Sequence, residues 1–522
     1  MIVEITLSLL IIFLIIVYNI SKWRFGYWKK RNVPFLEPVP VLGNYGPFIL
    51  FKKFIGLVAQ DLCQKMPNKP YFGVFYGTEP TLMVQDPEMV KTVLTKDFYY
   101  FSSREISKYT HREVFSQNLF FTYGDKWKVY RQNLTPLFSS SKMKKMFYLI
   151  EKCAHVFENM LDHEFKTNNV HGVRHLMARY TMDCIGSCAF GINTNTMDQN
   201  STKNPFTNIG ELLFEESYIR GILVNLRAIW PAIFYGIGLR SFPKQVDDFF
   251  NQLMMGVFKE RNYKPINRND FVDLILNWNV GNYIIGDSIE NMKGGDKKVK
   301  LEVNDEMLVS QCMLFFAAGF ETSSTTLQYT LYELAKHPDA QKRVIQEVDE
   351  YLKRHDNKLD YDCNAELPFT EACFDEALRL YPVVSILTRE TADEYTLPCG
   401  AVIEKGIRVH IPVYHIHHNP DLFPDVEMFR PERFYGEEKR NIKPYSYMPF
   451  GEGPRLCIGM RFAKMQMFSG IITLLKKYQV ELAADTPRKL NFKSTTLVTQ
   501  PKELIKLKFV EREGWEQRMF NK

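Results

Sequence analysis

The sequence lacks most of the features that mark modular or nucleic-acid-binding proteins. After residue 50 it has no Gly/Ser-rich linker, no low-complexity run and no internal repeat. The 522 residues, 45% of them hydrophobic, are therefore expected to form one large fold with room for a buried cofactor. The 66 basic and 60 acidic residues are too evenly balanced for a polyanionic partner, so binding to nucleic acid is not predicted.

Closely paired cysteines are also absent. The nine cysteines are an odd number, and no two of them form a Cys-x-x-Cys pair. Cys184 and Cys188 have the closest spacing, which is more typical of two buried small apolar residues than of a metal pair. We interpret the body of the protein as residing in a reducing compartment, an interpretation that native disulfides would contradict.

A long hydrophobic run is present at the N-terminus. Residues 2–20 are mostly Ile, Leu, Val and Phe, with Glu4 as the one charge, and these 19 residues approach the roughly 20 needed to cross a bilayer. No small-residue cleavage site follows them, and a buried core helix is the alternative interpretation. The basic residues that come next favour a cytoplasmic location for the rest of the chain: Lys22, Arg24, Lys29, Lys30 and Arg31. We predict a transmembrane signal anchor at 1–21, a basic and proline-rich hinge at 22–45 and one main domain at 46–522.

The main domain is expected to be mainly α with a minor β-sheet region. Helical periodicity predicts helices over 143–165, 245–260, 305–336, 338–354 and 459–478. β-Branched and aromatic patches punctuated by Gly and Pro predict short strands within 71–85 and 395–412. The polar, Gly-rich stretch 262–304 predicts an exposed loop around Gly294 and Gly295.

The segment 450–459 reads FGEGPRLCIG and is followed by a helix-forming run. A cysteine binds a metal as its thiolate, and the start of a helix lowers the pKa of a thiol such as that of Cys457. Gly453 permits a tight turn, and Gly459 lets the backbone approach a flat ligand where a Cβ would clash. Taken alone, Cys457 is better explained as an ordinary buried cysteine.

Together, these positions resemble the haem-binding loop FxxGxRxCxG of the cytochrome P450 family, and every fixed position is met. The resemblance implies the cytochrome P450 fold, preceded here by one N-terminal transmembrane helix. It also implies haem b as the cofactor, with the Cys457 thiolate as the axial iron ligand, which favours O–O cleavage. Phe450, Arg455 and Gly459 are then expected to contact the haem, and Arg455 to pair with a propionate.

Three further motifs match the family in the same order. Trp127 and Arg131, at i and i+4, share a helix face and match the pair that binds a haem propionate. By resemblance, Arg389 and, through a shorter motif, Arg104 also contact propionates. Glu376 and Arg379, with Arg433 downstream, match a charge network that stabilises the fold; without the resemblance they would be ordinary surface charges.

The helix expected at 305–336 contains the segment AGFET at 318–322, which resembles the oxygen-activating motif of the family. An acid in an apolar helix needs an explanation, because burying an unpaired carboxylate is costly. The resemblance implies that the Thr322 hydroxyl binds dioxygen, that Glu321 relays protons and that Gly319 leaves room beside the haem. A solvated polar stripe is the alternative interpretation.

The resemblance implies a monooxygenase that inserts one oxygen atom of O2 into a hydrophobic small molecule: RH + O2 + two electrons + two protons give ROH + H2O. The sequence has no GxGxxG fingerprint, P-loop or Cys-rich iron–sulfur pattern, so the electrons must come from another protein. The resemblance points to an NADPH-cytochrome reductase, with cytochrome b5 as a second partner. With membrane lipid around the anchor, it places the protein in the endoplasmic reticulum membrane with its catalytic domain facing the cytoplasm. Candidate basic residues for binding the reductase are Lys126, Lys128, Lys142, Lys144, Lys145, Arg461 and Lys464.

The segments 119–138 and 180–191 are most similar to insect microsomal enzymes that handle plant toxins and insecticides. Because related enzymes also make hormones, xenobiotics and endogenous lipids or hormones are both expected substrate classes. The residues expected by resemblance to form an apolar substrate pocket are Phe120, Phe121, 209–225, Phe315, Val383, Val384, Ile386 and Leu387.

Two other functions remain open. Some members of the family isomerise or dehydrate peroxides with the haem alone, and these often lack the acid–alcohol pair. A non-enzymatic membrane carrier of haem or lipid would need the thiolate loop but no proton relay. Glu321 and Thr322 therefore favour dioxygen activation.

Overall fold

Helices dominate the structure, as the periodicity predicted. The structure, a computed structural model, describes residues 2–198, 204–214, 217–268, 270–496 and 498–521, with side chains for all of these except 2–7, 9–14, 279 and 280. Its α-helices are α1 (Ile2–Phe25), α2 (Tyr27–Lys30), α3 (Gly46–Ile49), α4 (Ile55–Gln64), α5 (Pro87–Lys91), α6 (Gly124–Leu134), α7 (Ser140–Thr167), α8 (Val173–Ile185), α9 (Pro205–Leu213), α10 (Tyr218–Ile229), α11 (Pro231–Gly236), α12 (Lys244–Glu260), α13 (Phe271–Val280), α14 (Asp305–Lys336), α15 (Pro338–Arg354), α16 (Cys363–Glu366), α17 (Pro368–Leu380), α18 (Val413–His417) and α19 (Met460–Leu475).

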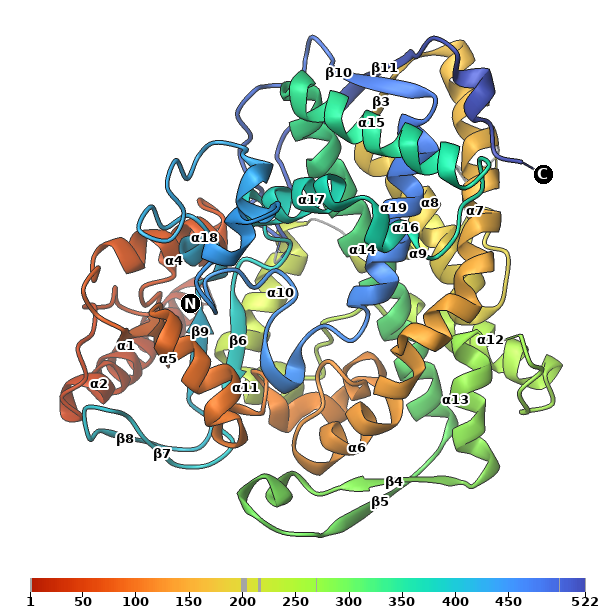
Figure 1. The fold of residues 1–522 in the computed structure, drawn as a ribbon. Helices are drawn as coiled ribbons and strands as arrows, with labels where there is room; N and C mark the ends of the chain where they lie inside the picture. Colours follow the sequence, from red (N-terminus) through yellow and green to blue (C-terminus); the bar gives the residue numbers. More distant parts are fainter. Residues whose placement is uncertain (1, 199–203, 215–216, 269, 497, 522) are drawn as a thin grey trace.

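The strands form small sheets at the edges of this helical body (Figure 1). They are β1 (Tyr71–Tyr76), β2 (Glu79–Val84), β3 (Val170–Gly172), β4 (Tyr283–Asp287), β5 (Lys298–Glu302), β6 (Leu387–Glu390), β7 (Tyr395–Thr396), β8 (Val402–Ile403), β9 (Arg408–Ile411), β10 (Tyr478–Leu482) and β11 (Lys506–Glu511). The largest sheet has the order β1-β2-β9-β6, in which β9 runs parallel to β2. A second sheet has the order β10-β11-β3, while β4 pairs with β5 and β7 with β8.

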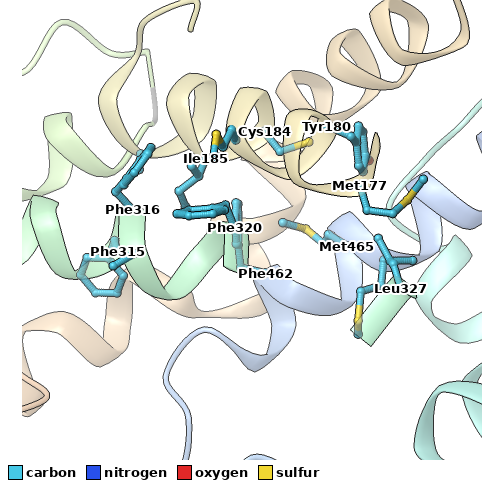
Figure 2. Packing of buried hydrophobic residues seen from close by; sticks show 14 of the residues in the cluster. Met177, Tyr180, Cys184, Ile185, Phe315, Phe316, Phe320, Leu327, Phe462 and Met465 are labelled. Atoms are coloured by element: carbon cyan, nitrogen blue, oxygen red, sulfur yellow. The ribbon is translucent and has the colours of Figure 1, made fainter. Parts of the chain in front are cut away.

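Helix α14 passes through the middle of the body (Figure 1) and is buried along most of its length. Its start is fixed by Asn304, whose side chain accepts a hydrogen bond from the Met307 N–H at 2.9 Å. Pro338, just beyond its end, begins α15. Figure 2 shows how α8, α14 and α19 pack together through side chains that include Ile185, Phe320 and Met465. The long central helix therefore forms a rigid wall for the site described below.

The segment expected to be a hinge packs against the first sheet. The Trp28 ring is fully buried, and its indole N–H donates to the Val74 carbonyl at 3.0 Å. A Cβ at Gly73 would overlap this ring. Residues 34–36 continue along β1, where the N–H of Gly73 donates to the Pro34 carbonyl at 2.7 Å.

Residues 2–25, which include the expected membrane anchor, form α1. The side chains of most of that apolar run lie outside the described residues. Within the part of the chain that the structure describes, no helix combines the length and the hydropathy needed to cross a bilayer.

The region 262–304 contains more regular structure than the predicted loop. It contains α13 and the β4–β5 hairpin, which lies along α6 (Figure 1). Gly294 and Gly295 are exposed in the connection between the two strands, and Gly294 has a positive φ of 97°. The polar, Gly-rich composition of the region led to the prediction of a loop, although the residues of β5 alternate between exposed and half-buried, as in a strand.

Candidate active site

A cavity lies between α14, α19, α6 and the segment 449–459. Its wall is almost entirely apolar apart from arginine, hydroxyl and thiol groups. Of the sequence-predicted site residues, the structure brings together around this cavity Thr322, Gly319, Cys457, Arg455, Phe450, Gly459, Trp127, Arg131, Arg389 and Arg104. Glu321 is not among the lining residues.

The loop before α19 presents Cys457 to this cavity. The Cys457 N–H donates to the Phe450 carbonyl at 2.9 Å, which closes the loop. Gly453 has a φ of +70°, and a Cβ there would overlap the Leu94 carbonyl oxygen. Cys457 retains accessible surface and is one of the residues that line the cavity.

The electrostatics of Cys457 differ from the expectation of a lowered pKa. Burial raises the pKa of the thiol above its ordinary value. The Gly459 N–H and the charges of Arg131 and Arg104 act in the opposite direction without overcoming burial. The helix start alone therefore does not ionise this thiol, and a bound metal would have to stabilise the thiolate.

Four arginines line the cavity without an acidic partner there. They are Arg104, Arg131, Arg389 and Arg455, and no Asp or Glu belongs to the described lining. Burial and, to a smaller extent, repulsion from Arg389 lower the pKa of Arg104 to about 9. Burial lowers the pKa of Arg389 to about 10. The Nε atoms of Arg104 and Arg389 have no hydrogen-bond partner among the described residues, so this cluster requires an anion.

Arg455 is engaged differently from Arg104 and Arg389. Its guanidinium donates to the carbonyls of Ser102 (2.7 Å), Thr122 (2.7 Å) and Phe120 (3.3 Å), and it stacks on the Trp127 ring at 4.5 Å. Arg455 therefore connects the 102–122 segment to the loop 450–459, which carries Cys457. Burial and the nearby arginines hold the pKa of Arg455 well below its usual range. Arg131 Nη1 donates to the Leu456 carbonyl at 2.8 Å, so it braces the same loop from α6.

The two other glycines of the motifs have different surroundings. A Cβ built on Gly459 meets no protein atom within 4 Å, although Gly459 lines the cavity. The protein itself therefore does not demand glycine there, whereas a flat ligand in the cavity would. A Cβ on Gly319 would come within 2.5 Å of Ile185 Cδ1, so this glycine also permits α8 to approach α14.

Thr322 and Glu321 occupy different faces of α14. The Thr322 hydroxyl lines the cavity and donates to the Ala318 carbonyl at 2.7 Å. The Glu321 side chain is 1% exposed and accepts two hydrogen bonds of 2.8 Å from Arg174 Nη2. Gln500 Nε2 donates a third hydrogen bond to this carboxylate at 2.8 Å. The buried acid is thus paired, but it is directed away from the cavity.

Glu376, Arg379 and Arg433 form one buried network. Arg379 binds both oxygens of Glu376, at 2.8 and 2.9 Å. Arg433 Nε lies 3.3 Å from Glu376 Oε1. The remaining donors bind backbone: Arg379 donates to the His417 carbonyl at 3.0 Å, and Arg433 to the Asp425 carbonyl at 2.8 Å. The network therefore ties α17 to the segment 417–433, outside the cavity.

These residues fit a haem. The cavity offers a thiol at the start of a helix, arginines that require an anion such as a propionate, and open space over Gly459. Apolar side chains from α14 and α19 supply the faces that a macrocycle would contact. Of the expected pocket residues, Phe120, Phe315, Val383, Val384 and Leu387 line the cavity. Phe121, Ile386 and the described part of 209–225 do not.

Sequence reasoning missed two groups of residues. Arg174 and Gln500, which bind Glu321, lie 147 and 179 residues away in sequence, and no local pattern connects them to the acid. Ile185, Cys188 and Ala189, near the end of α8 and after it, also line the cavity. The apolar segment around Cys188 was the available signal.

Comparisons with known proteins agree with this geometry. The sequence profile of the family described as "Cytochrome P450" matches residues 33–509. Cytochrome P450 6B2 of Helicoverpa armigera is 37% identical over 494 residues, which cover 94% of each chain. Cytochrome P450 6k1 of Blattella germanica is 34% identical over 493 residues, covering 94% of this chain and 93% of its own. Cytochrome P450 9e2 of the same organism is 34% identical over 495 residues and 91% of both chains. These relatives are insect proteins, as predicted from the amino-acid sequences of 119–138 and 180–191.

Proposed function

The chain belongs to the cytochrome P450 family and is a cytochrome P450 monooxygenase, and on this premise we propose that Cys457 holds the iron of haem b. The observation that carries this proposal is that the Cys457 thiol lines the same cavity as a cluster of arginines that have no acid beside them. An alternative thiol ligand would have to line the same cavity. Cys188 does so, but burial raises its pKa well above the ordinary value, and the charge of Arg268 opposes this shift without overcoming it.

When bound, the haem would supply the oxidising chemistry, and the Cys457 thiolate, as its proposed ligand, would supply the electron density that favours O–O cleavage. The residues of the chain supply its surroundings. Arg104 and Arg389 would hold the propionates through the donors that now have no protein partner. Trp127 and Arg131, on one face of α6, would complete this edge of the site. Arg455 keeps the 102–122 segment against the loop, and the apolar wall excludes water.

Two protons are consumed for each molecule of product. We propose that the Thr322 hydroxyl binds dioxygen in the cavity and that Glu321 carries protons toward it. Two adjacent positions of α14 support this division of roles: Thr322 places a hydroxyl in the cavity wall, and Glu321 is a buried, paired acid. Because Glu321 faces away from the cavity, its carboxylate has to turn, or a water has to bridge the gap.

The substrate is proposed to be a neutral, hydrophobic small molecule. Apart from the arginines, Thr322, Ser323, Thr326 and Cys457, the lining is apolar or aromatic. The similarity to insect enzymes supports xenobiotics such as plant toxins or insecticides as the class to test first. Endogenous lipids and hormones share the same apolar character and are the second class.

The electrons are proposed to come from NADPH through a partner cytochrome reductase, with cytochrome b5 as a further donor. Among the basic residues expected to bind this partner, Lys144 and Lys145 are exposed on α7. Lys144 lies 3.9 Å from Asp362, and Lys464 is paired with Glu371. The exposed Lys144 and Lys145 support an acidic docking partner.

We place the protein in the endoplasmic reticulum membrane with its catalytic domain facing the cytoplasm. The apolar run at 2–20 and the basic residues after it support an anchor in this orientation. A separate exposed hydrophobic surface on α10 and near α11 supports contact with lipid: Tyr218, Ile219, Ile222, Ile233 and Ile237.

The decisive test is the absorption spectrum of the reduced protein under carbon monoxide. Wild type is expected to show the strongly red-shifted Soret band of thiolate ligation, and Cys457→Ser is expected to lose it. Cys399→Ser is the matched control, because Cys399 is the other exposed cysteine and does not line the cavity. Folded, haem-loaded wild type without the band would overturn the assignment of Cys457.

Turnover separates monooxygenation from the two other functions. The proposal predicts product formation with NADPH, O2 and reductase. Turnover of an organic peroxide without reductase, and none with it, would identify an isomerase or dehydratase instead. A carrier would bind haem or lipid, and Thr322→Ala would leave every one of its activities unchanged.

A further inference from the structure

Gln500 joins the acid of α14 to the C-terminal part of the chain. Its amide nitrogen donates both hydrogens: one to Glu321 Oε1 at 2.8 Å and one to Thr325 Oγ1 at 2.9 Å. Gln500 is 3% exposed, and Glu321 and Thr325 are buried even more completely. One side chain therefore fixes the carboxylate relative to the next turn of the same helix.

The backbone around Gln500 is itself fixed. The Thr499 N–H donates to the Val383 carbonyl at 3.0 Å, and Val498 forms a β-bridge with Val384. From α14, the Tyr329 hydroxyl donates to the Thr499 carbonyl at 3.0 Å. Gln500 is therefore held by the segment whose valines line the cavity, and not by α14 alone.

Glu321 lies in the partition between two hollows. Thr322, the next residue, lines the large cavity. On the other side, Arg174 and Gln500 line a second hollow between α8, α9 and the segment 500–505. The Arg174 side chain is 36% exposed there, whereas that of Glu321 is 1% exposed. A carboxylate in this position can serve the cavity only if its orientation is controlled.

We infer that Gln500 is a positioning residue that sets the orientation of the Glu321 carboxylate and thereby the delivery of protons to the cavity. The inference rests on the proposed function, because it gives Glu321 a proton to carry. In the ion pair with Arg174, Nη2 lies 2.8 Å from each carboxylate oxygen, so this contact does not distinguish Oε1 from Oε2. The hydrogen bond from Gln500 is made to Oε1, so it makes the two oxygens unequal.

The experiment compares three variants of the full-length protein in the presence of reductase and NADPH. Gln500→Leu removes both hydrogen bonds at similar volume. Thr325→Val is close to isosteric and removes the acceptor that orients Gln500 while leaving Gln500 in place. Gln341→Leu is the matched control: Gln341 is also a buried amide, 5% exposed, and it joins α15 to β10 through the Val480 backbone. An alkoxycoumarin, which releases a fluorescent phenol on O-dealkylation, is the probe substrate.

The readouts are product formed per NADPH, hydrogen peroxide released and the solvent deuterium isotope effect on product formation. Gln500→Leu is expected to lower product per NADPH about threefold or more, to raise peroxide correspondingly and to change the isotope effect. Its haem content and carbon monoxide spectrum are expected to match wild type. Thr325→Val is expected to shift the same readouts in the same direction, and Gln341→Leu to change none of them.

Unchanged coupling and isotope effect in both Gln500→Leu and Thr325→Val would overturn the inference, provided that Thr322→Ala shifts them in the same assay. An equal loss of coupling in Gln341→Leu would also overturn it, because the effect would then be a general consequence of losing a buried amide. Failure of the proposed function is a separate result: wild type would then show no thiolate spectrum or no NADPH-dependent product.

Discussion

The backbone N–H of Cys457 donates to the carbonyl oxygen of Phe450 at 2.9 Å, so both ends of the proposed ligand loop are joined by one hydrogen bond. Within the loop, Gly451 and Gly453 have φ values of +75° and +70°. The position of the thiol therefore depends on backbone conformations that other residues adopt only with strain.

Gly453 and Gly459 are expected to respond differently to alanine. Gly453→Ala has to displace the Leu94 backbone and adopt a strained φ, which is expected to cost about 2 kcal/mol or more of unfolding free energy. Gly459→Ala meets no protein atom, so it is expected to preserve stability but lower haem content. Denaturant unfolding and haem quantification test this pair. Equal haem content in Gly459→Ala and wild type would contradict the role given to Gly459.

The buried Glu376 network is expected to be essential for stability. Glu376→Gln leaves the charges of Arg379 and Arg433 without their carboxylate, and it is expected to cost about 3–5 kcal/mol. Glu437→Gln is the control, because Glu437 pairs with Arg440 on the exposed surface and is expected to contribute little. Urea unfolding measures both. A similar small change in the two variants would contradict a structural role for Glu376.

Asp375 predicts a measurable pH dependence. Burial, with a contribution from Glu371, raises the pKa of this carboxyl from 3.8 to about 6 in the folded protein. Between these values the folded state binds more protons than the unfolded chain, so this group lowers stability as pH rises. Asp375→Asn removes the titration, and its stability relative to wild type is expected to increase by about 2 kcal/mol between pH 4 and pH 7.5. A difference that does not vary with pH would contradict the raised pKa.

Lys126 and Lys128 test the proposed docking of the reductase. Reversing both charges to Glu is expected to raise the KM for reductase and to flatten its dependence on ionic strength. Lys297→Glu with Lys298→Glu, on the β4–β5 hairpin, is the control double reversal of equal charge change. An unchanged salt dependence of reductase coupling in the Lys126/Lys128 variant would exclude this surface.

Much of the fold could be predicted from local sequence. The expected helices 305–336 and 338–354 coincide with α14 and α15, because Asn304 and Pro338 mark their ends chemically. The hairpin of β1 and β2 lies within the expected 71–85. The aromatic and β-branched residues that indicated strands there are buried. The hairpin at 283–302 was missed because its stability comes from packing on α6, which no local pattern records.

Site residues could be predicted only where they belong to a recognisable sequence motif. The cavity-lining arginines and Cys457 belong to such motifs, and the structure brings them together. The direction of the Glu321 side chain could not be predicted, since it depends on Arg174 and Gln500 from distant segments. The binding of Arg455 to three backbone carbonyls could not be predicted either. A hydrogen bond to a backbone carbonyl does not depend on the side chain of the partner residue, so the partner segment shows no sequence pattern for it.

Trp28 lies against Gly73 in the first sheet, with its indole bonded to Val74. The chain between α1 and the sheet is therefore not a slack tether. If α1 anchors the protein in a membrane as proposed, the contact of Trp28 with the sheet couples the orientation of α1 to that of the cavity wall next to β6. Shortening or loosening the segment around Trp28 is then expected to change the direction from which a lipid-dissolved molecule reaches the cavity.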